Sequence, residues 1–171
     1  MNRQPQPAIT WREDMIPQDV TLIERFASAS GFFRPDEVLL AADFAAEHLS
    51  KGPESGYNFI FAQEGDQTLG YACYGHIPGT LHSWSLYWII VNQSTRSRGL
   101  GSRLLAQVEQ RVAAAGGERL YIETSSQPMY HPTRRFYQSR GYTLLTVLED
   151  FYARGDGKVV YAKTMPDLAK G

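Results

Sequence analysis

The chain has 171 residues, a formal net charge of −1 and one cysteine. A chain of this length is most simply one domain with a proper buried core. Its balanced charge gives no general attraction to nucleic acid or to an anionic membrane. The single cysteine, Cys73, excludes an internal disulfide and suits a reducing compartment. Because Cys73 stands in an apolar run, we interpret it as a buried, inert thiol.

The two ends of the chain carry no pattern of a folded element. Segment 1–7 has no apolar core of the kind that a signal peptide needs. No stretch approaches the roughly 20 apolar residues of a membrane span. We therefore expect a disordered lead at 1–7, a single folded domain at 8–165 and a short tail at 166–171. The protein is expected to be cytoplasmic, with no nucleic-acid or membrane partner.

The first half of the chain predicts two helices among short strands. Segment 8–12 reads as a first strand, and helices follow at 17–30 and 35–51, each opened by a proline. Segments 57–63 and 69–77 then read as a strand pair around a Gly-containing turn. A mixed sheet with helices against it is the architecture that this order favours.

The second half alternates strands and helices. An apolar strand at 86–91 leads through a polar turn into a helix that ends near Ala115, and a further strand occupies 119–124. A short helix through Phe136 and Tyr137 follows, and then a closing hairpin of two strands, 142–153 and 158–164. The strands at 86–91 and 119–124 are joined by a helical crossover, so we expect them to be parallel neighbours.

The turn between strand 86–91 and its helix is basic and contains two glycines. It reads Arg96-Ser97-Arg98-Gly99-Leu100-Gly101-Ser102. The first amides of a helix have no intrahelical partner and lie at the positive end of its dipole. Gly99 and Gly101 let an anion approach the backbone, and Arg96 and Arg98 can pair with phosphate oxygens. The stretch therefore predicts a cradle for a diphosphate.

Two common phosphate-binding patterns do not fit this turn. A Walker loop needs Lys followed by Ser or Thr after its second glycine, and this chain has neither there. The dinucleotide fingerprint needs a third small residue where this chain has Leu104, and it follows its strand directly without arginines.

The spacing Arg96-x-x-Gly99-x-Gly101, with its strand and helix, resembles the acetyl-CoA site of the GNAT superfamily of N-acetyltransferases. A second segment, Arg135-Phe136-Tyr137-Gln138-Ser139-Arg140-Gly141-Tyr142, resembles the late helix-to-strand segment of that family. The resemblance implies an acetyltransferase domain over 8–165 with an α/β (α+β) fold. Its mixed, mostly antiparallel sheet of about seven strands is flanked by helices, and its central parallel strands splay at one end.

The resemblance also assigns residues to the site. It implies that acetyl-CoA is the cosubstrate and that Tyr137 protonates the departing thiolate. It implies an oxyanion donor on a main-chain amide near Ile89. The residues expected to bind the cofactor are Ile89, Ile90, Val91, Arg96, Ser97, Arg98, Gly99, Leu100, Gly101, Ser102 and Phe136. The four histidines have no ligand-like spacing, so we expect no metal.

The general base is not identified by the sequence. Ser85 stands where some relatives place a carboxylate, and Tyr130 stands where many carry Asn. Glu123 acting through a water and Glu123 as a plain surface carboxylate are both open. Direct attack by an amine that is already neutral needs no base, and we name none.

The acceptor and the partners stay open too. The family builds its acceptor site from segments that here are 32–50, Tyr57 and 76–85, and the acidic residues among them suit either a cationic amine or solvated helix faces. The closing hairpin slightly favours a peptide amino terminus over a lysine or a small-molecule amine. A homodimer is possible. The alternatives are a non-catalytic acyl-CoA-binding sensor, favoured by Ser85, and an enzyme that uses the glycine turn for ATP.

Overall fold

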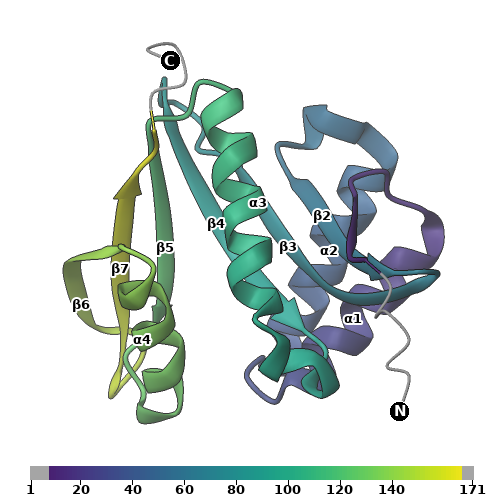
Figure 1. Cartoon of the computed structure of the whole chain (residues 1–171). Helices are drawn as coiled ribbons and strands as arrows, with labels where there is room; N and C mark the ends of the chain where they lie inside the picture. Colours follow the sequence, from purple (N-terminus) through teal and green to yellow (C-terminus); the bar gives the residue numbers. More distant parts are fainter. Residues whose placement is uncertain (1–7, 167–171) are drawn as a thin grey trace, which may run out of the picture. The chain divides into compact units, whose positions relative to one another are not determined.

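Seven strands form one sheet in the computed structural model, which describes residues 8–166 apart from the side chains of 96–98. The strands are β1 (Thr10–Arg12), β2 (Asn58–Glu64), β3 (Gln67–His76), β4 (Ser83–Val91), β5 (Arg119–Ser125), β6 (Thr143–Ala153) and β7 (Asp156–Thr164), and their order in the sheet is β1-β2-β3-β4-β5-β7-β6 (Figure 1). The helices are α1 (Pro17–Ser30), α2 (Pro35–Lys51), α3 (Leu100–Ala114) and α4 (His131–Ser139). Short 3-10 helices are η1 (Gly52–Ser55), η2 (Gln93–Arg98) and η3 (Pro128–Tyr130). The expected disordered lead and all but the first residue of the expected tail lie outside the described residues.

The pairing directions confirm the predicted mixed sheet. β1 with β2, β2 with β3, β5 with β7 and β6 with β7 are antiparallel. β4 and β5 are parallel, and their pairing covers Ser83–Leu86 against Arg119–Ile122. This pairing includes only the first part of β4, which agrees with the expectation of two parallel strands that pair at one end. The contacts divide the chain into two compact units, one comprising residues up to Tyr74 with Trp88–Val108 and the other Gly75–Tyr87 with the chain from Glu109 on.

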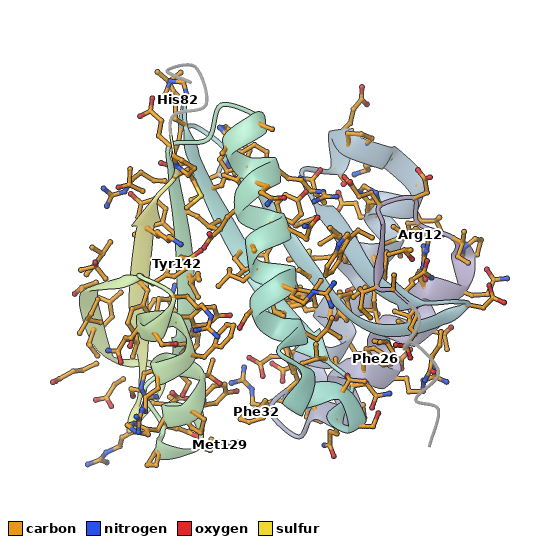
Figure 2. The ribbon with its side chains drawn as sticks, viewed as in Figure 1. Arg12, Phe26, Phe32, His82, Met129 and Tyr142 are labelled. Atoms are coloured by element: carbon orange, nitrogen blue, oxygen red, sulfur yellow. The ribbon has the colours of Figure 1, made fainter. Side chains whose placement is uncertain are left out.

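The core of the first unit is an aromatic face of β2 and β3. Residues two apart on a strand share a face, and Phe59 and Phe61 stack there with ring centroids 6.3 Å apart. Helix α1 packs on this face through Phe26, whose ring centroid lies 6.4 Å from that of Tyr71 (Figure 2). Helix α2 packs on it through His48, 5.5 Å from Phe59. The two predicted amino-terminal helices thus cover the same side of β2 and β3.

Helix α1 is held at its start by a buried ion pair. Asp19 accepts a hydrogen bond from the Ile16 amide at 2.9 Å, which caps the helix. The same carboxylate pairs with Arg12 of β1 at 2.7 Å, and Asp19 is only 2% exposed. Gly31 ends the helix at φ 75°, as the sequence predicted.

The second unit contains β5, β6, β7 and α4. The loop between β5 and α4 is fixed by Arg134, whose guanidinium donates to the carbonyls of Ser125 at 2.7 Å and Gln127 at 3.0 Å. The Ser126 amide donates to the carbonyl of Gly157 in β7 at 2.8 Å. The Gly157 amide in turn donates to the Ser126 hydroxyl, also at 2.8 Å. These bonds set where α4 begins.

Candidate active site

The end of β4 is held tightly against β3. The Asn92 amide donates to the Leu69 carbonyl at 2.8 Å. Gly70 of β3 faces this end so closely that a Cβ there would lie 2.8 Å from the Ile90 oxygen and 2.7 Å from Val91 Cγ1. Only glycine allows this approach of the two backbones. Ile90 is buried, and Ile89 and Val91 are half-buried.

The turn after β4 is more ordered than the sequence suggested. We expected a polar turn that leads directly into the helix, whereas a 3-10 helix, η2, precedes α3. Its start is capped by the Asn92 side chain, which accepts from the Ser94 amide at 3.2 Å. The buried Thr95 hydroxyl donates to the Asn92 carbonyl at 2.8 Å, and Gln93 reaches the Ala29 carbonyl of α1 at 3.0 Å.

Gly99 joins η2 to α3 in a left-handed conformation, with φ 68° and no atom within 4 Å of the place where a Cβ would stand. The Arg103 amide donates a hydrogen bond to the Gly99 carbonyl, four residues earlier, at 3.2 Å. This bond belongs to the start of helix α3. The main-chain amides at the start of α3 lie at the positive end of the helix dipole. Leu100, Leu104 and Leu105 are at most 2% exposed, so the first turns of the helix are anchored. The side chains of Arg96, Ser97 and Arg98 lie outside the described residues.

The strand, the 3-10 turn and the helix start follow one another in the order expected for a diphosphate site. The open space at Gly99 admits an oxygen-rich group close to the backbone, and the helix dipole favours negative charge there. The residues therefore fit the diphosphate of coenzyme A.

Tyr137 lies in α4 with its ring buried between two other aromatic rings. Its centroid is 5.2 Å from that of Phe136 and 5.8 Å from that of Tyr142, both in edge-on contact. Tyr142 donates its hydroxyl to Glu109 of α3 at 2.9 Å, and Lys163 of β7 lies 3.0 Å from the same carboxylate (Figure 2). Burial raises the pKa of Tyr137 well above that of a free phenol. A phenol is protonated at neutral pH even without this shift, and the shift makes Tyr137 a weaker acid than a free phenol.

Comparison with known proteins decides the family. A sequence model of the acetyltransferase (GNAT) family matches residues 21–142. Among solved structures, a GNAT-family protein from Desulfovibrio desulfuricans is 42% identical with a TM-score of 0.91, over 93% of this chain and 100% of that one. The chain belongs to the GNAT family. It is therefore an acetyltransferase with acetyl-CoA as its cosubstrate, which confirms the expected class, fold and cosubstrate.

More distant GNAT structures share the fold alone. The ribosomal-protein-S18-alanine N-acetyltransferase from Escherichia coli is 18% identical, with a TM-score of 0.70, over 92% of this chain and 94% of that one. An aminoglycoside 6'-N-acetyltransferase complexed with coenzyme A is 20% identical, with a TM-score of 0.73, over 93% of this chain and 97% of that one. No curated protein matches the chain in sequence.

Glu123, a candidate base in this GNAT chain, and Ser85, which replaces a carboxylate of some relatives, have other contacts. Glu123 of β5 forms an ion pair with Lys158 of β7 at 2.8 Å. Lys158 in turn lies over the Phe151 ring, 3.9 Å from its centroid. Ser85 is paired in register with Tyr121 and is half-buried. The surface reading of Glu123 thus gains support, because its charge already has a partner.

A stack of aromatic rings lies beside the end of β4. Phe44 of α2 stacks on Tyr57 at 3.9 Å and on Trp88 at 5.4 Å, and Phe33 meets Trp88 edge-on at 5.9 Å. Trp88 directly precedes Ile89, so the stack adjoins the residues expected to bind the thioester arm. Phe33, Phe44 and Tyr57 fall within the segments expected to build the acceptor site. The sequence did not indicate that Phe44 stacks on both Tyr57 and Trp88.

The acidic residues of α2 are largely compensated. Arg34 pairs with Asp36 at 3.2 Å and with Glu37 at 3.8 Å, and Lys51 pairs with Glu47 at 2.8 Å. The hydrogen bond from Arg34 is the main cause that lowers the pKa of Asp36. These contacts favour solvated helix faces over a dedicated cation site.

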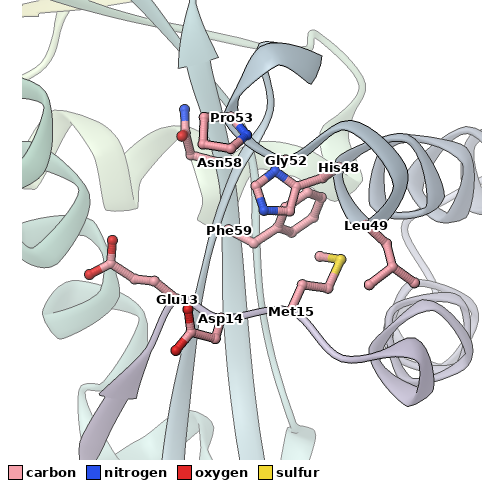
Figure 3. Close-up of a pocket in the computed structure, with 9 residues that line it drawn as sticks. All are labelled: Glu13, Asp14, Met15, His48, Leu49, Gly52, Pro53, Asn58 and Phe59. Carbon is pink, nitrogen blue, oxygen red and sulfur yellow. The ribbon is translucent and has the colours of Figure 1, made fainter.

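A cavity of about 380 Å³ opens in the first unit next to α2 (Figure 3). Its lining residues are Glu13, Asp14, Met15, His48, Leu49, Gly52, Pro53, Asn58 and Phe59. His48 Nδ1 lies 2.6 Å from the Tyr57 carbonyl, which fixes the ring at the cavity wall. The sequence gave no sign of this cavity, because segment 13–15 meets α2 only in the fold.

Residues 8–166 show neither a cluster of metal ligands nor a helix that could span a membrane. No group of three or more His, Cys, Asp or Glu side chains is arranged to hold a metal ion there. Over the same residues, none of the helices combines the length and the apolar character that a bilayer crossing requires.

Proposed function

We propose that this enzyme transfers the acetyl group of acetyl-CoA to a primary amine by direct attack, with both substrates bound at once. The observation that carries the proposal is the site at the end of β4, where η2, the left-handed Gly99 and the first turn of α3 offer main-chain amides to a diphosphate. The acceptor is a peptide amino terminus, a lysine or a small-molecule amine.

In this proposal the cosubstrate is held chiefly by main-chain atoms. The amides of residues 97–102 bind the diphosphate, and Arg96 and Arg98 add charge. Ile89, Ile90 and Val91 present the strand edge to the pantetheine arm, and Phe136 contributes an apolar contact. The fixed position of β4 against Gly70 supports this assignment, because a strand that binds an extended ligand must not shift.

A thioester supplies an activated acetyl group with a thiolate as its leaving group. The chain's own residues have two tasks around it. A main-chain amide near Ile89 donates to the carbonyl oxygen as that oxygen gains charge. Tyr137 holds a phenolic proton and delivers it to the departing sulfur. The position of Tyr137 in α4 between two aromatic rings supports the second task, because these rings hold the phenol in one orientation.

The proton of the amine leaves through solvent in this proposal. No carboxylate stands at Ser85, and Glu123 is already paired with Lys158. The same observation at Ser85 favours a second candidate function, a non-catalytic acyl-CoA sensor. Both candidates bind acetyl-CoA, but only the acetyltransferase releases CoA by transferring the acetyl group.

Thiol release from acetyl-CoA, measured with a panel of amines, tests the proposal. The panel contains peptides with free amino termini, lysine peptides with blocked termini, an aminoglycoside and a polyamine. We expect release with at least one of these classes and not without an acceptor. Tight binding of acetyl-CoA with no release on any acceptor would favour the sensor.

Thermal shift measurements separate both candidates from a nucleotide enzyme. A ligand that binds only the folded state stabilises it by RT ln(1 + [L]/Kd). We expect acetyl-CoA and free CoA to raise Tm and ATP to have a much smaller effect. Stabilisation by ATP alone would contradict the assignment of the diphosphate site to coenzyme A.

A further inference from the structure

The second unit contains a buried carboxylate that the proposed reaction does not use. Asp156 is the first residue of β7 and is 7% exposed. It accepts a hydrogen bond from the hydroxyl of Ser125, the last residue of β5, at 2.5 Å. Hydrogen bonds from hydroxyls to carboxylates are typically this short and are stronger than bonds between neutral groups. Because burial of a carboxylate in itself opposes folding, we looked for what this bond holds in place.

The Ser125 hydroxyl also contacts the loop that leads from β5 into α4. Its oxygen accepts a hydrogen bond from the Gln127 amide at 3.0 Å. A serine hydroxyl has one proton and two lone pairs. Because the proton points at Asp156, the lone pairs are left to accept from the amide. The carboxylate therefore fixes the rotation of the Ser125 hydroxyl, and the hydroxyl fixes the first turn of the loop.

Helix α4 is anchored on the same two loop residues. Arg134 of α4 donates to the carbonyls of Ser125 and Gln127, which are the residues that the hydroxyl also links. The helix has only nine residues, and among the described residues no side-chain hydrogen bond caps its start. Arg134 is therefore its main polar anchor at this end. Tyr137 lies three residues after Arg134, on the neighbouring turn of the same helix face.

The other end of α4 is fixed by separate contacts. The Tyr137 carbonyl accepts hydrogen bonds from the amides of Arg140 at 3.0 Å and Tyr142 at 3.2 Å. The Tyr142 hydroxyl in turn donates to Glu109 at 2.9 Å. Tyr137 thus lies between two anchors, one at each end of a short helix. Displacement of a reacting group by about 1 Å can lower a rate on the order of 10²-fold, so both anchors matter for a proton donor.

We propose that Asp156 and Ser125 are positioning residues for Tyr137. Their hydrogen bond holds the loop on which α4 rests, and the loop sets the direction in which the Tyr137 hydroxyl points. Neither residue contacts a substrate in this proposal. It rests on the proposed function, in which Tyr137 protonates the departing thiolate. Loss of the bond should therefore lower kcat and leave the Kd of acetyl-CoA nearly unchanged.

Steady-state kinetics of single variants test the positioning role, with the best acceptor of the amine panel. Ser125→Ala removes the hydroxyl, and we expect kcat to fall about tenfold while the Kd of acetyl-CoA changes less than about twofold. Asp156→Asn should give part of this loss, because an uncharged acceptor makes a weaker bond. Ser125→Thr keeps a hydroxyl and should restore most of kcat.

Asp19→Asn is the matched control. Asp19 is another buried carboxylate, 2% exposed, and it lies in the first unit at the start of α1. The change should lower Tm without lowering kcat. Wild-type kcat in folded Ser125→Ala and Asp156→Asn chains, judged by circular dichroism, overturns the proposal.

A double-mutant cycle with Tyr137→Phe separates this proposal from the proposed function. If Ser125 acts through the Tyr137 hydroxyl, Ser125→Ala should lower kcat less than about twofold once that hydroxyl is gone. Equal losses in the two backgrounds would refute the positioning role and leave Tyr137 as the acid. Wild-type kcat in Tyr137→Phe alone would refute the acid, and the positioning role with it.

Amide hydrogen exchange gives a second measurement that needs no acceptor. Ser125→Ala should speed exchange of the amides in 127–137 at least about tenfold, because the loop loses its link to β7. Asp19→Asn should leave these amides unchanged. Exchange in 127–137 that is the same in Ser125→Ala and wild type would also overturn the proposal.

Discussion

The two regions proposed to act in acetyl transfer use different kinds of group. Around the end of β4 and the start of α3, main-chain atoms are proposed to bind the cosubstrate, and glycines make room for it. In α4 the side chain of Tyr137 is the proposed proton donor, and the rings of Phe136 and Tyr142 contact it. In the first region, added side-chain volume should weaken acetyl-CoA binding. In the second region, loss of the phenol hydroxyl should lower kcat.

This difference gives matched experiments. A substitution that adds one carbon to a glycine tests the main-chain region without altering charge. A substitution that removes one oxygen from a tyrosine tests α4 without altering shape. Each can be paired with a control elsewhere in the chain that makes the same chemical change.

Removal of the Tyr137 hydroxyl should have the largest effect. We expect Tyr137→Phe to lower kcat by on the order of 10²-fold, because the departing thiolate loses its positioned acid. The phenylalanine ring keeps the contacts to Phe136 and Tyr142, so the fold and the Kd of acetyl-CoA should change little. Steady-state kinetics and calorimetric titration measure the two quantities.

Tyr142→Phe is the control for this change. Tyr142 is a buried phenol in ring contact with Tyr137, and its hydroxyl donates to Glu109. Loss of that charged hydrogen bond should lower the free energy of unfolding by about 1–3 kcal/mol. The change in kcat should be far smaller than for Tyr137→Phe. Equal kcat for Tyr137→Phe and wild type would remove Tyr137 from the mechanism.

Gly70→Ala should disturb the end of β4. The added Cβ would lie 2.7 Å from Val91 Cγ1 and 2.8 Å from the Ile90 oxygen, so the strand must move. Overpacking of this kind costs about 1–3 kcal/mol of stability. We also expect weaker acetyl-CoA binding by calorimetry, because the moved residues are those proposed to bind the cosubstrate.

Gly117→Ala separates the local effect from general destabilisation. A Cβ at Gly117 would lie 2.4 Å from Val112 Cγ1 and 2.7 Å from Trp84 Cδ1, so it is also overpacked. It should lower stability without altering the Kd of acetyl-CoA. If both variants bind acetyl-CoA like wild type, the end of β4 is not part of the binding site.

Gly99→Ala should have a smaller effect, through the backbone alone. No atom lies within 4 Å of its Cβ position, but φ 68° is a left-handed conformation that costs a non-glycine residue about 1–2 kcal/mol. We expect a matching loss of stability and an acetyl-CoA affinity weaker by up to about tenfold, as the amides at the start of α3 shift.

Gly116→Ala makes the same change just beyond the other end of the same helix. Gly116 has φ 79° and equally open space around its Cβ position. It should lower Tm by a similar amount and leave acetyl-CoA affinity unchanged. An affinity loss at Gly116 as large as at Gly99 would argue against an anion site at the start of α3.

The sequence predicted the strand and the helix on either side of the glycine turn. The apolar spacing of Leu100, Leu104 and Val108 set the helix, and its glycine turn indicated an anion site, because both signals lie within one stretch of chain. The 3-10 helix before α3 was missed. It depends on the Asn92 cap and on the contact of Gln93 with Ala29, a residue far away in the sequence.

Long-range contacts explain the other gaps. Gly70 lies within the strand expected at 69–77, and only the fold shows that it faces Ile90 and Val91. Phe44 likewise looked like one more residue of a helix. In contrast, the ion pair of Glu47 with Lys51 could be predicted from the sequence, because residues four apart on a helix are neighbours.

The two buried tyrosines of the second unit predict how stability changes at high pH. Burial raises the pKa of Tyr137, and burial followed by the charge of Glu109 raises that of Tyr142. The unfolded chain ionises its tyrosines near pH 10, so it then binds fewer protons than the folded chain. Stability from these groups is therefore fully present below about pH 10 and is lost as pH rises further.

Urea unfolding at a series of pH values measures this dependence. Each phenol that stays protonated in the fold should contribute a fall of up to about 1.4 kcal/mol per pH unit above pH 10. Above pH 10, Tyr142→Phe should reduce the fall in unfolding free energy per pH unit by the contribution of one phenol. Between pH 7 and 9 it should leave the pH dependence unchanged. An unchanged slope in Tyr142→Phe above pH 10 would mean that this phenol ionises as readily in the fold as in the unfolded chain, which its place beside Glu109 opposes.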